Sequence, residues 1–393
     1  MCIWIGVPVL AVELFAPRVI RRTSCGPSGP PLWRPDGQVG WALIPGAEGD
    51  AVVCDGSRDV ARHHVRINSA GYRDRERSYA PDGATPRVVV LGDSFTEALQ
   101  VSLPETFAQR LEGALGAEVL NLGVSGYSTD NELRLFRLRA ASYAPDVVLL
   151  VFFVGNDVLE NGAMLYLKNP HGLPPKPWLE SAGASPALSR CLAAHRAAAR
   201  VADRTPSALW ASSRIVRFGL ATGVDWALGG LCENATGPPL DPGVSELLGV
   251  YGPPATPAWE EGWRTTGTLL MELRDAVQST GATLAVALAP AGYEYAPELR
   301  QVAALAPASR WRSADVGYPY RRLGALLDAA RVPWLSLEPA LRTRYAATGR
   351  PGCYAWDGHW TAEGHATVAD ALAPFLRSLI PPGRGTMSRA DTG

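Results

Sequence analysis

Five short runs rich in apolar residues divide this 393-residue chain into segments of different periodicity. The runs occupy residues 87–91, 118–122, 146–154, 282–288 and 332–337. Continuous apolar runs of this length are typical of parallel strands that are buried on both faces of a sheet. Because helix-like segments separate the runs, the pattern predicts a three-layer α/β/α sandwich around a five-stranded parallel sheet.

Segments with an apolar residue at every third or fourth position predict the helices. They cover residues 104–115, 129–143, 259–279, 319–330 and 361–379. For the helix at 129–143 we expect Thr129 or Ser128 as N-cap, with Glu132 placed to close a capping box. Sites in such sheets form at the carboxyl ends of the strands, so the residues after each apolar run are the first candidates for chemistry.

The regular alternation breaks between residues 161 and 257, where Pro- and Gly-rich loops flank helix-like stretches near 187–201 and 208–220. We interpret this segment as a largely helical insertion that caps the α/β domain. A cap of this kind is the expected source of substrate specificity, with Trp210 and the neighbourhood of Ser212–Ser213 as candidates.

The patterns divide the chain into four parts. These are a hydrophobic N-terminal anchor (1–22), a connector and N-terminal extension (23–86), the α/β domain (87–380) and a disordered tail (381–393). The connector is rich in Gly and Pro up to residue 49, with one strand expected at 39–43 and two strand-like stretches within 52–67.

The N-terminal segment bears on the compartment. Residues 1–16 are apolar except for Glu13, and a basic cluster of Arg18, Arg21 and Arg22 follows. Sixteen helical residues span about 24 Å, short of the roughly 30 Å hydrocarbon core. We expect membrane association through this segment, with the α/β domain outside the cytoplasm. The basic cluster favours the opposite orientation by the positive-inside rule, and an amphipathic helix packed on the domain is the alternative to an anchor.

Composition excludes several partners. The net charge of −1 disfavours nucleic acid, because phosphate binding needs a basic surface. We expect no cofactor and no metal, since the chain has no P-loop, no G-x-G-x-x-G pattern and no C-x-x-C spacing among its six cysteines.

In an exported protein, Cys25–Cys54 and Cys191–Cys232 are possible disulfides with Cys353 left over, and buried free thiols are the alternative.

Gly92, Asp93 and Ser94 follow the first apolar run and precede a helical region. A serine hydroxyl becomes a useful nucleophile when it is exposed at a tight turn beside a base. Gly92 permits a sharp turn, and the backbone N–H groups after it can face a developing oxyanion. The alternative is that Asp93 or Ser94 simply caps a helix.

Two further polar turns follow the second and third runs. In the first, the backbone N–H of Gly126 is a candidate oxyanion donor, and in the second the Asn156 carboxamide is another. A carboxamide suits this role because it donates a hydrogen bond without carrying a charge. Ordinary turn chemistry, with an Asx turn at Asn156, is the alternative in both places.

Asp357 and His359 precede the last predicted helix. His359 is the natural base for Ser94, and Asp357 would fix the tautomer of the ring and stabilise its imidazolium form. A surface loop with helix-capping residues such as Thr361 is the alternative. His365 is a rival base, which we expect to take part in packing.

These four blocks, in this order, resemble the SGNH (GDSL-like) hydrolase superfamily. The resemblance covers residues 87–157 and 282–379 and implies a flavodoxin-like α/β/α fold. The site residues that it implies are Ser94 as nucleophile, Asp357 and His359 as the rest of the triad, and the backbone amides of Ser94 and Gly126 with Asn156 as the oxyanion hole.

One departure concerns the last block. Many members of the superfamily carry Asp-x-x-His, whereas this chain has Asp-x-His, which resembles the branch related to alginate and other polysaccharide O-acetyltransferases. Residues 68–73 and the anchor-plus-connector layout also look like a bacterial membrane-anchored SGNH subgroup.

The resemblance implies a serine-dependent hydrolase that acts through an acyl-enzyme on small O-acyl esters of a small molecule or a glycan. An O-acyltransferase of a cell-envelope polysaccharide, in which an acceptor alcohol outcompetes water, would use the same residues. A non-catalytic glycan-binding protein on the same scaffold is the third possibility.

Overall fold

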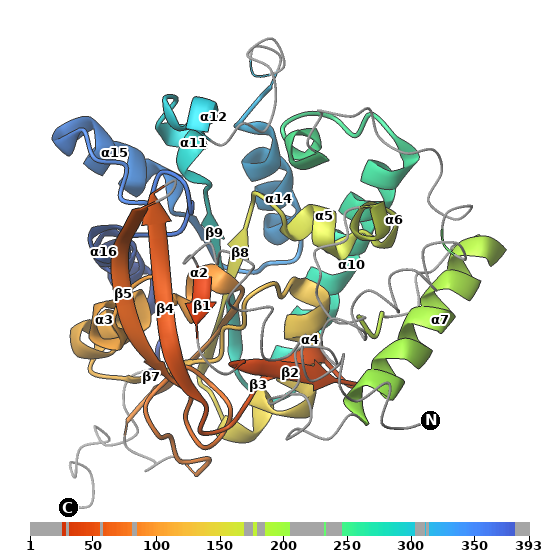
Figure 1. The fold of residues 1–393 in the computed structure, drawn as a ribbon, viewed down its shortest axis with the longest axis horizontal. Coiled ribbons are helices and arrows are strands. Elements are labelled where there is room, and N and C mark those ends of the chain that lie inside the picture. Colours follow the sequence, from red (N-terminus) through yellow and green to blue (C-terminus); the bar gives the residue numbers. More distant parts are fainter. Residues whose placement is uncertain are drawn as a thin grey trace, which may run out of the picture.

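The structure is a computed structural model that describes residues 26–28, 31–55, 58–80, 85–168, 176–178, 185–204, 232, 246–302, 311 and 314–381. Its central sheet consists of β6 (Arg87–Gly92), β7 (Glu118–Asn121), β8 (Val147–Phe153), β9 (Thr283–Ala289) and β10 (Trp334–Ser336) (Figure 1). The strands lie in the order β10-β9-β8-β6-β7, and every neighbouring pair is parallel. The predicted five-stranded parallel sheet is therefore confirmed, with the strand order of the flavodoxin-like fold.

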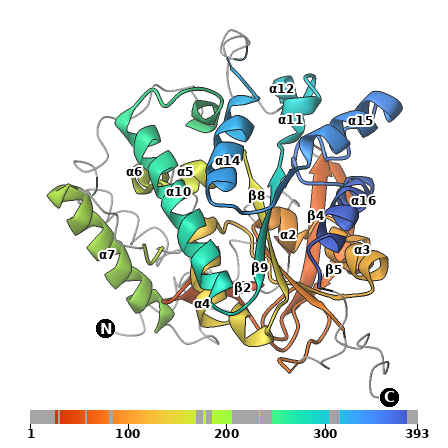
Figure 2. The ribbon, with the colours of Figure 1, turned by 180° about the vertical axis from the view of Figure 1, so that it is seen from behind.

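Two helical layers cover the sheet. Figures 1 and 2 show α3 (Phe107–Leu115), α15 (Glu338–Thr348) and α16 (Ala362–Arg377) on one side, and α4 (Thr129–Leu138), α10 (Pro257–Gln278) and α14 (Tyr318–Ala329) on the other. Side chains of β6 alternate between the layers: Val88 and Val90 pack with α3 and α16, and Val89 and Leu91 pack on the opposite face. This two-sided burial explains the continuous apolar run in the sequence and confirms the three-layer sandwich.

The remaining helical segments are short or belong to the insertion. They are α2 (Ser94–Glu97), η1 (Leu103–Glu105), η2 (Ala140–Tyr143), α5 (Asp157–Asn161), α6 (Ala163–Lys168), α7 (Pro186–Asp203), η3 (Glu246–Val250), α11 (Gly292–Tyr295) and α12 (Leu299–Val302). Among the described residues, no helix has both the length and the apolar character needed to cross a membrane. The expected anchor at 1–16, the helix expected near 208–220 and the candidates Trp210 and Ser212–Ser213 lie outside the described residues.

One helix differs from its predicted form, and another was not predicted. The helix expected at 129–143 ends at Leu138 and is followed by η2, a 3-10 turn. Ser128 is its N-cap, as one of the two alternatives had it, but Asn131 closes the capping box because its Oδ1 accepts the Ser128 N–H at 3.3 Å. The expectation for Glu132 is therefore wrong, and its carboxyl group is buried instead. Helix α15 has no counterpart among the predicted helices.

The chain before β6 forms antiparallel strands. β2 (Trp33–Asp36) pairs with β3 (Gly40–Leu43), and β4 (Glu48–Asp55) pairs with both β1 (Gly26–Ser28) and β5 (Arg58–Arg66). Trp41 on β3 is buried, and its Nε1 donates a hydrogen bond to the backbone oxygen of Ser125 at 2.9 Å. Tyr127 Oη in turn donates to the backbone oxygen of Trp41 at 2.6 Å. This extension therefore holds the loop that follows β7.

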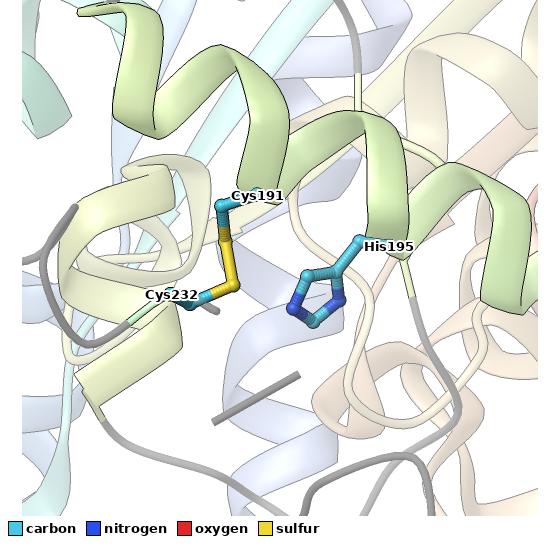
Figure 3. Close-up of side chains that lie close together, drawn as sticks. All are labelled: Cys191, His195 and Cys232. Carbon is cyan, nitrogen blue, oxygen red and sulfur yellow. A yellow bond between two sulfur atoms is a disulfide. The ribbon is translucent and has the colours of Figure 1, made fainter. Parts of the chain in front are cut away.

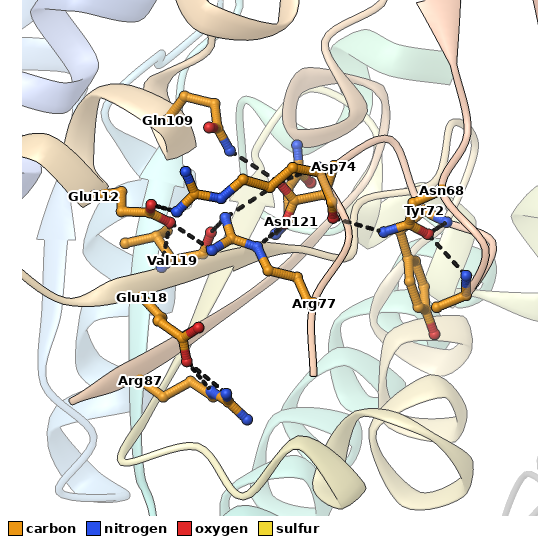
Figure 4. Close-up of polar contacts among 12 residues, drawn as sticks. Asn68, Tyr72, Asp74, Arg77, Arg87, Gln109, Glu112, Glu118, Val119 and Asn121 are labelled. Carbon is orange, nitrogen blue, oxygen red and sulfur yellow. Dashed lines mark hydrogen bonds and ion pairs between the residues drawn. The ribbon is translucent and has the colours of Figure 1, made fainter. Parts of the chain in front are cut away.

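Polar side chains fix the next segment to the sheet (Figure 4). Asn68 Oδ1 accepts the Tyr72 N–H at 2.9 Å, which closes a turn. Asp74 is buried, accepts the Asn121 N–H at 3.2 Å and pairs with Arg77 at 2.9 Å. Gln109 on α3 donates to Asp74 as well, at 2.9 Å. The segment therefore ties the end of β7 to α3.

Arg73 supports the turn that begins at Ser94. Its guanidinium is buried and donates hydrogen bonds to the backbone oxygens of Glu97 at 2.8 Å, Ala98, and Val101 at 2.5 Å. Burial lowers the pKa of Arg73 to about 10, although the charge of Glu97 acts in the opposite direction. The guanidinium thus provides the partners that these buried carbonyl groups need.

We expect Arg73→Met to lower the free energy of unfolding by about 3 kcal/mol, because each buried carbonyl left without a donor costs about 1–3 kcal/mol. Methionine keeps most of the apolar stem and removes only the donors. Denaturant unfolding followed by circular dichroism measures the change. Arg350→Met is the control, because that side chain is 74% exposed. Equal stability of the two variants would contradict the role of Arg73.

Candidate active site

Ser94 lies at the start of α2, directly after the carboxyl end of β6. Asp93 is the N-cap of this single turn, and its Oδ1 accepts the Phe95 N–H at 2.9 Å. Gly92 is required for the close packing of the turn, because a Cβ there would lie 2.2 Å from Thr96 Oγ1. The capping role considered for Asp93 is thus present, and it leaves the Ser94 side chain free for other contacts.

The loop before α16 brings His359 to Ser94 across 265 positions of sequence. His359 Nε2 lies 2.7 Å from Ser94 Oγ, and His359 Nδ1 lies 2.7 Å from Asp357 Oδ1. The loop is closed by hydrogen bonds from Tyr354 N–H to the His359 oxygen at 2.9 Å and from Gly358 N–H to the Tyr354 oxygen at 2.8 Å. Three residues predicted to form a triad are therefore adjacent, in the expected order.

Asp357 and His359 shift each other's pKa. Burial would raise the pKa of Asp357, but the hydrogen bond and charge of His359 outweigh it and hold that pKa below its usual value. Burial would lower the pKa of His359, but the hydrogen bond and charge of Asp357, with the charge of Asp93, raise it on balance. Asp357 is thereby kept ionised, and His359 is a stronger base than a free imidazole.

His365 does not take part in this chain of contacts. Its ring is buried against Phe107 and Trp360, and its Nδ1 accepts the Phe107 N–H at 3.3 Å. Burial lowers the pKa of His365 to about 3, so the ring is neutral. His365 is a packing residue, as expected.

The loop after β7 carries Gly126 and is held by Glu97 of α2. Glu97 is buried and accepts hydrogen bonds from both the backbone N–H of Ser125, at 2.6 Å, and its Oγ, at 2.5 Å. Within the described part of the chain, the backbone N–H groups of Ser94 and Gly126 form no hydrogen bond. Both donors are available to a ligand.

Asn156 follows β8 and is the N-cap residue of α5, but its side chain does not cap that helix. Its Nδ2 donates to Glu160 Oε1 at 2.9 Å, and its Oδ1 is buried with no hydrogen-bond partner. The register of the sheet, with Val90 opposite Asn121 and Gly92 opposite Val151, aligns the ends of β6, β7 and β8. Asn156 therefore follows the same edge of the sheet as Ser94.

Comparison with known families agrees with this arrangement. The model of the GDSL-like lipase/acylhydrolase family matches residues 90–367. The chain belongs to this family. It is accordingly a carboxylic ester hydrolase of the GDSL type, and the match begins in β6 and ends within α16.

Solved structures of GDSL enzymes are similar to this chain at low identity. The lipase/acylhydrolase from Enterococcus faecalis is 14% identical with a TM-score of 0.36, and the alignment covers 76% of this chain and 100% of that one. A catalytic mutant of the acetylxylan esterase Axe2 from Geobacillus stearothermophilus is 14% identical with a TM-score of 0.38, over 76% of this chain and 95% of that one. No curated protein matches the sequence.

Buried ionisable side chains next to the GDSL motifs are the features that the sequence analysis missed. Glu97, Glu160 and Lys176 are each at most 4% exposed. The spacing could have identified the first two. Glu97 follows Ser94 by three residues and Glu160 follows Asn156 by four, so each lies on the same helix face as the motif residue before it. Lys176 is one of two lysines in the whole chain.

Of the two alternatives for the cysteines of this GDSL protein, disulfide bonding is the one that the structure shows for Cys191 and Cys232. Cys191 and Cys232 form a disulfide, as considered for an exported protein, and Cys353 is free and buried. Cys54 is also disulfide-bonded, while Cys25 lies outside the described residues. His195 lies beside the Cys191–Cys232 bridge, and these three side chains are the only group of potential metal ligands of this size among the described residues (Figure 3). The joined sulfur atoms leave no thiolate there to bind a metal.

We expect Asp357→Asn to lower the pKa of His359, because the variant removes the charge that raises it. An NMR titration of the His359 ring follows this directly, and the midpoint should move to lower pH. Asp370→Asn, an exposed acid on α16, is the control and should leave the midpoint unchanged. An unchanged midpoint in Asp357→Asn would mean that the Asp357 contact has no influence on the base.

Proposed function

We propose that the protein hydrolyses small O-acyl esters through a covalent acyl-enzyme on Ser94. The observation that carries the proposal is the continuous chain from Ser94 Oγ through His359 to Asp357, with 2.7 Å at each step. These are the distances that proton transfer between a nucleophile, a base and an orienting carboxylate requires.

In the first half-reaction, His359 Nε2 takes the Ser94 proton while Oγ attacks the ester carbonyl carbon. The carbonyl oxygen becomes an oxyanion, which the backbone N–H groups of Ser94 and Gly126 and the Asn156 carboxamide stabilise. The carbon–oxygen bond to the alcohol then breaks, and the imidazolium of His359 gives its proton to the leaving alcohol.

In the second half-reaction, water attacks the acyl-enzyme while His359 again takes a proton. Collapse of the second tetrahedral intermediate releases the carboxylic acid and returns the proton to Ser94. The base must be neutral in both halves. Since Asp357 raises the pKa of His359 above its usual 6.5, activity should rise with pH through that raised value.

Ser94→Ala should lower kcat on p-nitrophenyl acetate by about 10⁶-fold, and His359→Ala by a similar factor, because the triad acts as a unit. The double variant should lose little more than either single variant. The purified domain without residues 1–22 is the material, and the control is Ser279→Ala, a serine at the end of α10. Turnover indifferent to Ser94 would remove the acyl-enzyme from the proposal.

A glycan ester is the substrate class that we favour, and Trp356 is the reason. This side chain is 60% exposed and precedes Asp357 in the turn closed by the Gly358–Tyr354 hydrogen bond. An exposed indole beside the reacting groups offers an apolar surface with a polar edge, which suits the face of a sugar ring. Association of the N-terminus with a membrane would bring such a site to cell-envelope glycans.

We expect Trp356→Ala to raise KM for an acetylated oligosaccharide roughly tenfold, since loss of one aromatic contact is worth about 1.4 kcal/mol. KM for p-nitrophenyl acetate, which has no sugar ring, should change less. The matched control is Tyr79→Ala, an exposed aromatic residue (53%) beside Arg87, at the amino end of β6. Equal changes in KM for both esters would contradict the role of Trp356.

An O-acyltransferase is the second candidate, and the Asp-x-His spacing of Asp357 and His359 favours it. The same acyl-enzyme would then be attacked by an acceptor hydroxyl in place of water. Consumption of an acyl donor that depends on added glycan would indicate the transferase, and consumption without glycan would indicate the hydrolase.

A further inference from the structure

The carboxamide of Asn156 is held by a buried acid one helical turn further along the chain. Glu160 Oε1 accepts one of the two Nδ2 hydrogens at 2.9 Å, and the Glu160 side chain is buried. Asn156 Oδ1 has no partner, so the contact with Glu160 is the only side-chain hydrogen bond of this carboxamide within the described residues. The second Nδ2 hydrogen remains available.

We propose that Glu160 is a positioning residue, which holds the Asn156 carboxamide so that its second N–H faces the reacting carbonyl oxygen. The inference deepens the proposed function and rests on the donor role of Asn156 in it. The terminal torsion of asparagine is broad and roughly two-fold, so an unrestrained carboxamide can turn its oxygen towards an oxyanion. The bond to Glu160 removes that freedom before the substrate arrives.

Lys176, from the insertion, fixes the helix that carries Glu160. Its Nζ donates to the backbone oxygen of Glu160 at 3.1 Å and to Ser128 Oγ at 2.6 Å. The ammonium group also lies over the rings of Trp178 at 4.6 Å and Tyr166 at 5.4 Å. The insertion therefore links α5, which carries Glu160, to the start of α4.

The surroundings of Glu160 favour its neutral form. Burial raises its pKa to about 8, with a further increase from Asp93, although Lys176 and the Asn156 hydrogen bond oppose it. The acids that interact with it are Glu132 on α4 and Asp157 on α5, while Asp130 on α4 pairs with Lys176 and Glu261 on α10 lies against Gly162. A neutral acid still accepts the Asn156 N–H through its carbonyl oxygen, and it adds no negative charge behind a developing oxyanion.

Two variants of Glu160 separate its functions. Glu160→Leu removes the acceptor and fills a similar volume, so kcat on p-nitrophenyl acetate should fall roughly 10²-fold with little change in KM, as expected when a transition-state donor is misplaced. Glu160→Gln keeps an acceptor but cannot ionise. It should retain most of kcat near pH 7, and it should lack the decline that we expect in the native enzyme as pH rises through about 8.

The test is a cycle of Asn156→Ala, Glu160→Leu and the double variant, with Glu261→Gln as the control for a buried acid outside the site. Asn156→Ala should cost about 10²–10³ in kcat. If Glu160 acts through Asn156, the double variant should lose no more than Asn156→Ala alone. Additive losses, or no loss in Glu160→Leu while Asn156→Ala is impaired, would overturn the inference.

Two further outcomes separate a failure of the Asn156 role from a failure of the Glu160 role. Full activity of Asn156→Ala would remove Asn156 from the proposed oxyanion hole, and the inference would fall with it. If Glu160→Leu does not fold, as judged by circular dichroism, Glu160→Met takes its place in the cycle, because it also removes the acceptor at a similar length: losses that add to those of Asn156→Ala would overturn the inference.

Discussion

The pairing of β6 with β7 on one side and with β8 on the other determines where the side chains of the site begin. Val90 lies opposite Asn121, and Gly92 lies opposite Val151, so the carboxyl ends of three parallel strands lie at one edge of the sheet. Each strand is followed by a short polar turn, and these turns carry Ser94, Gly126 and Asn156. Because β6 is buried on both faces, a shift of one register position would exchange the side chains that face the two helical layers and force both layers to repack.

Short turns have few backbone hydrogen bonds of their own, and buried polar side chains replace them here. Arg73 binds the carbonyl groups after Ser94, Glu97 binds the loop before Gly126, and Glu160 binds Asn156. Burial of such groups is expensive and adds little net stability. Their effect is geometric, since each one restricts a turn that carries a candidate catalytic group. The N-terminal extension adds Trp41 to the same set of restraints.

Features that depend on neighbouring residues were predictable from the sequence, whereas those that depend on distant contacts were not. Strands β6, β8 and β9 were recognisable because two-sided burial leaves a continuous apolar run, and Ser94 and His359 because each follows or precedes a predicted element. The capping box was assigned to Glu132 because the spacing left open whether Ser128 or Thr129 is the N-cap, and with Ser128 as N-cap the third helical residue is Asn131. Arg139 ends α4 while it pairs with Asp36, 103 residues earlier.

The short Asp-x-His spacing is compatible with a complete triad. Asp357 Oδ1 lies 2.7 Å from His359 Nδ1 and also accepts the backbone N–H of His359 at 3.2 Å, so one oxygen orients both the ring and its backbone. Gly358, at φ +86°, supplies the left-handed conformation that this tight turn needs. The spacing therefore leaves the contacts of the base intact, and these contacts serve attack by water or by an alcohol equally. The choice between them depends on which molecule reaches the acyl group.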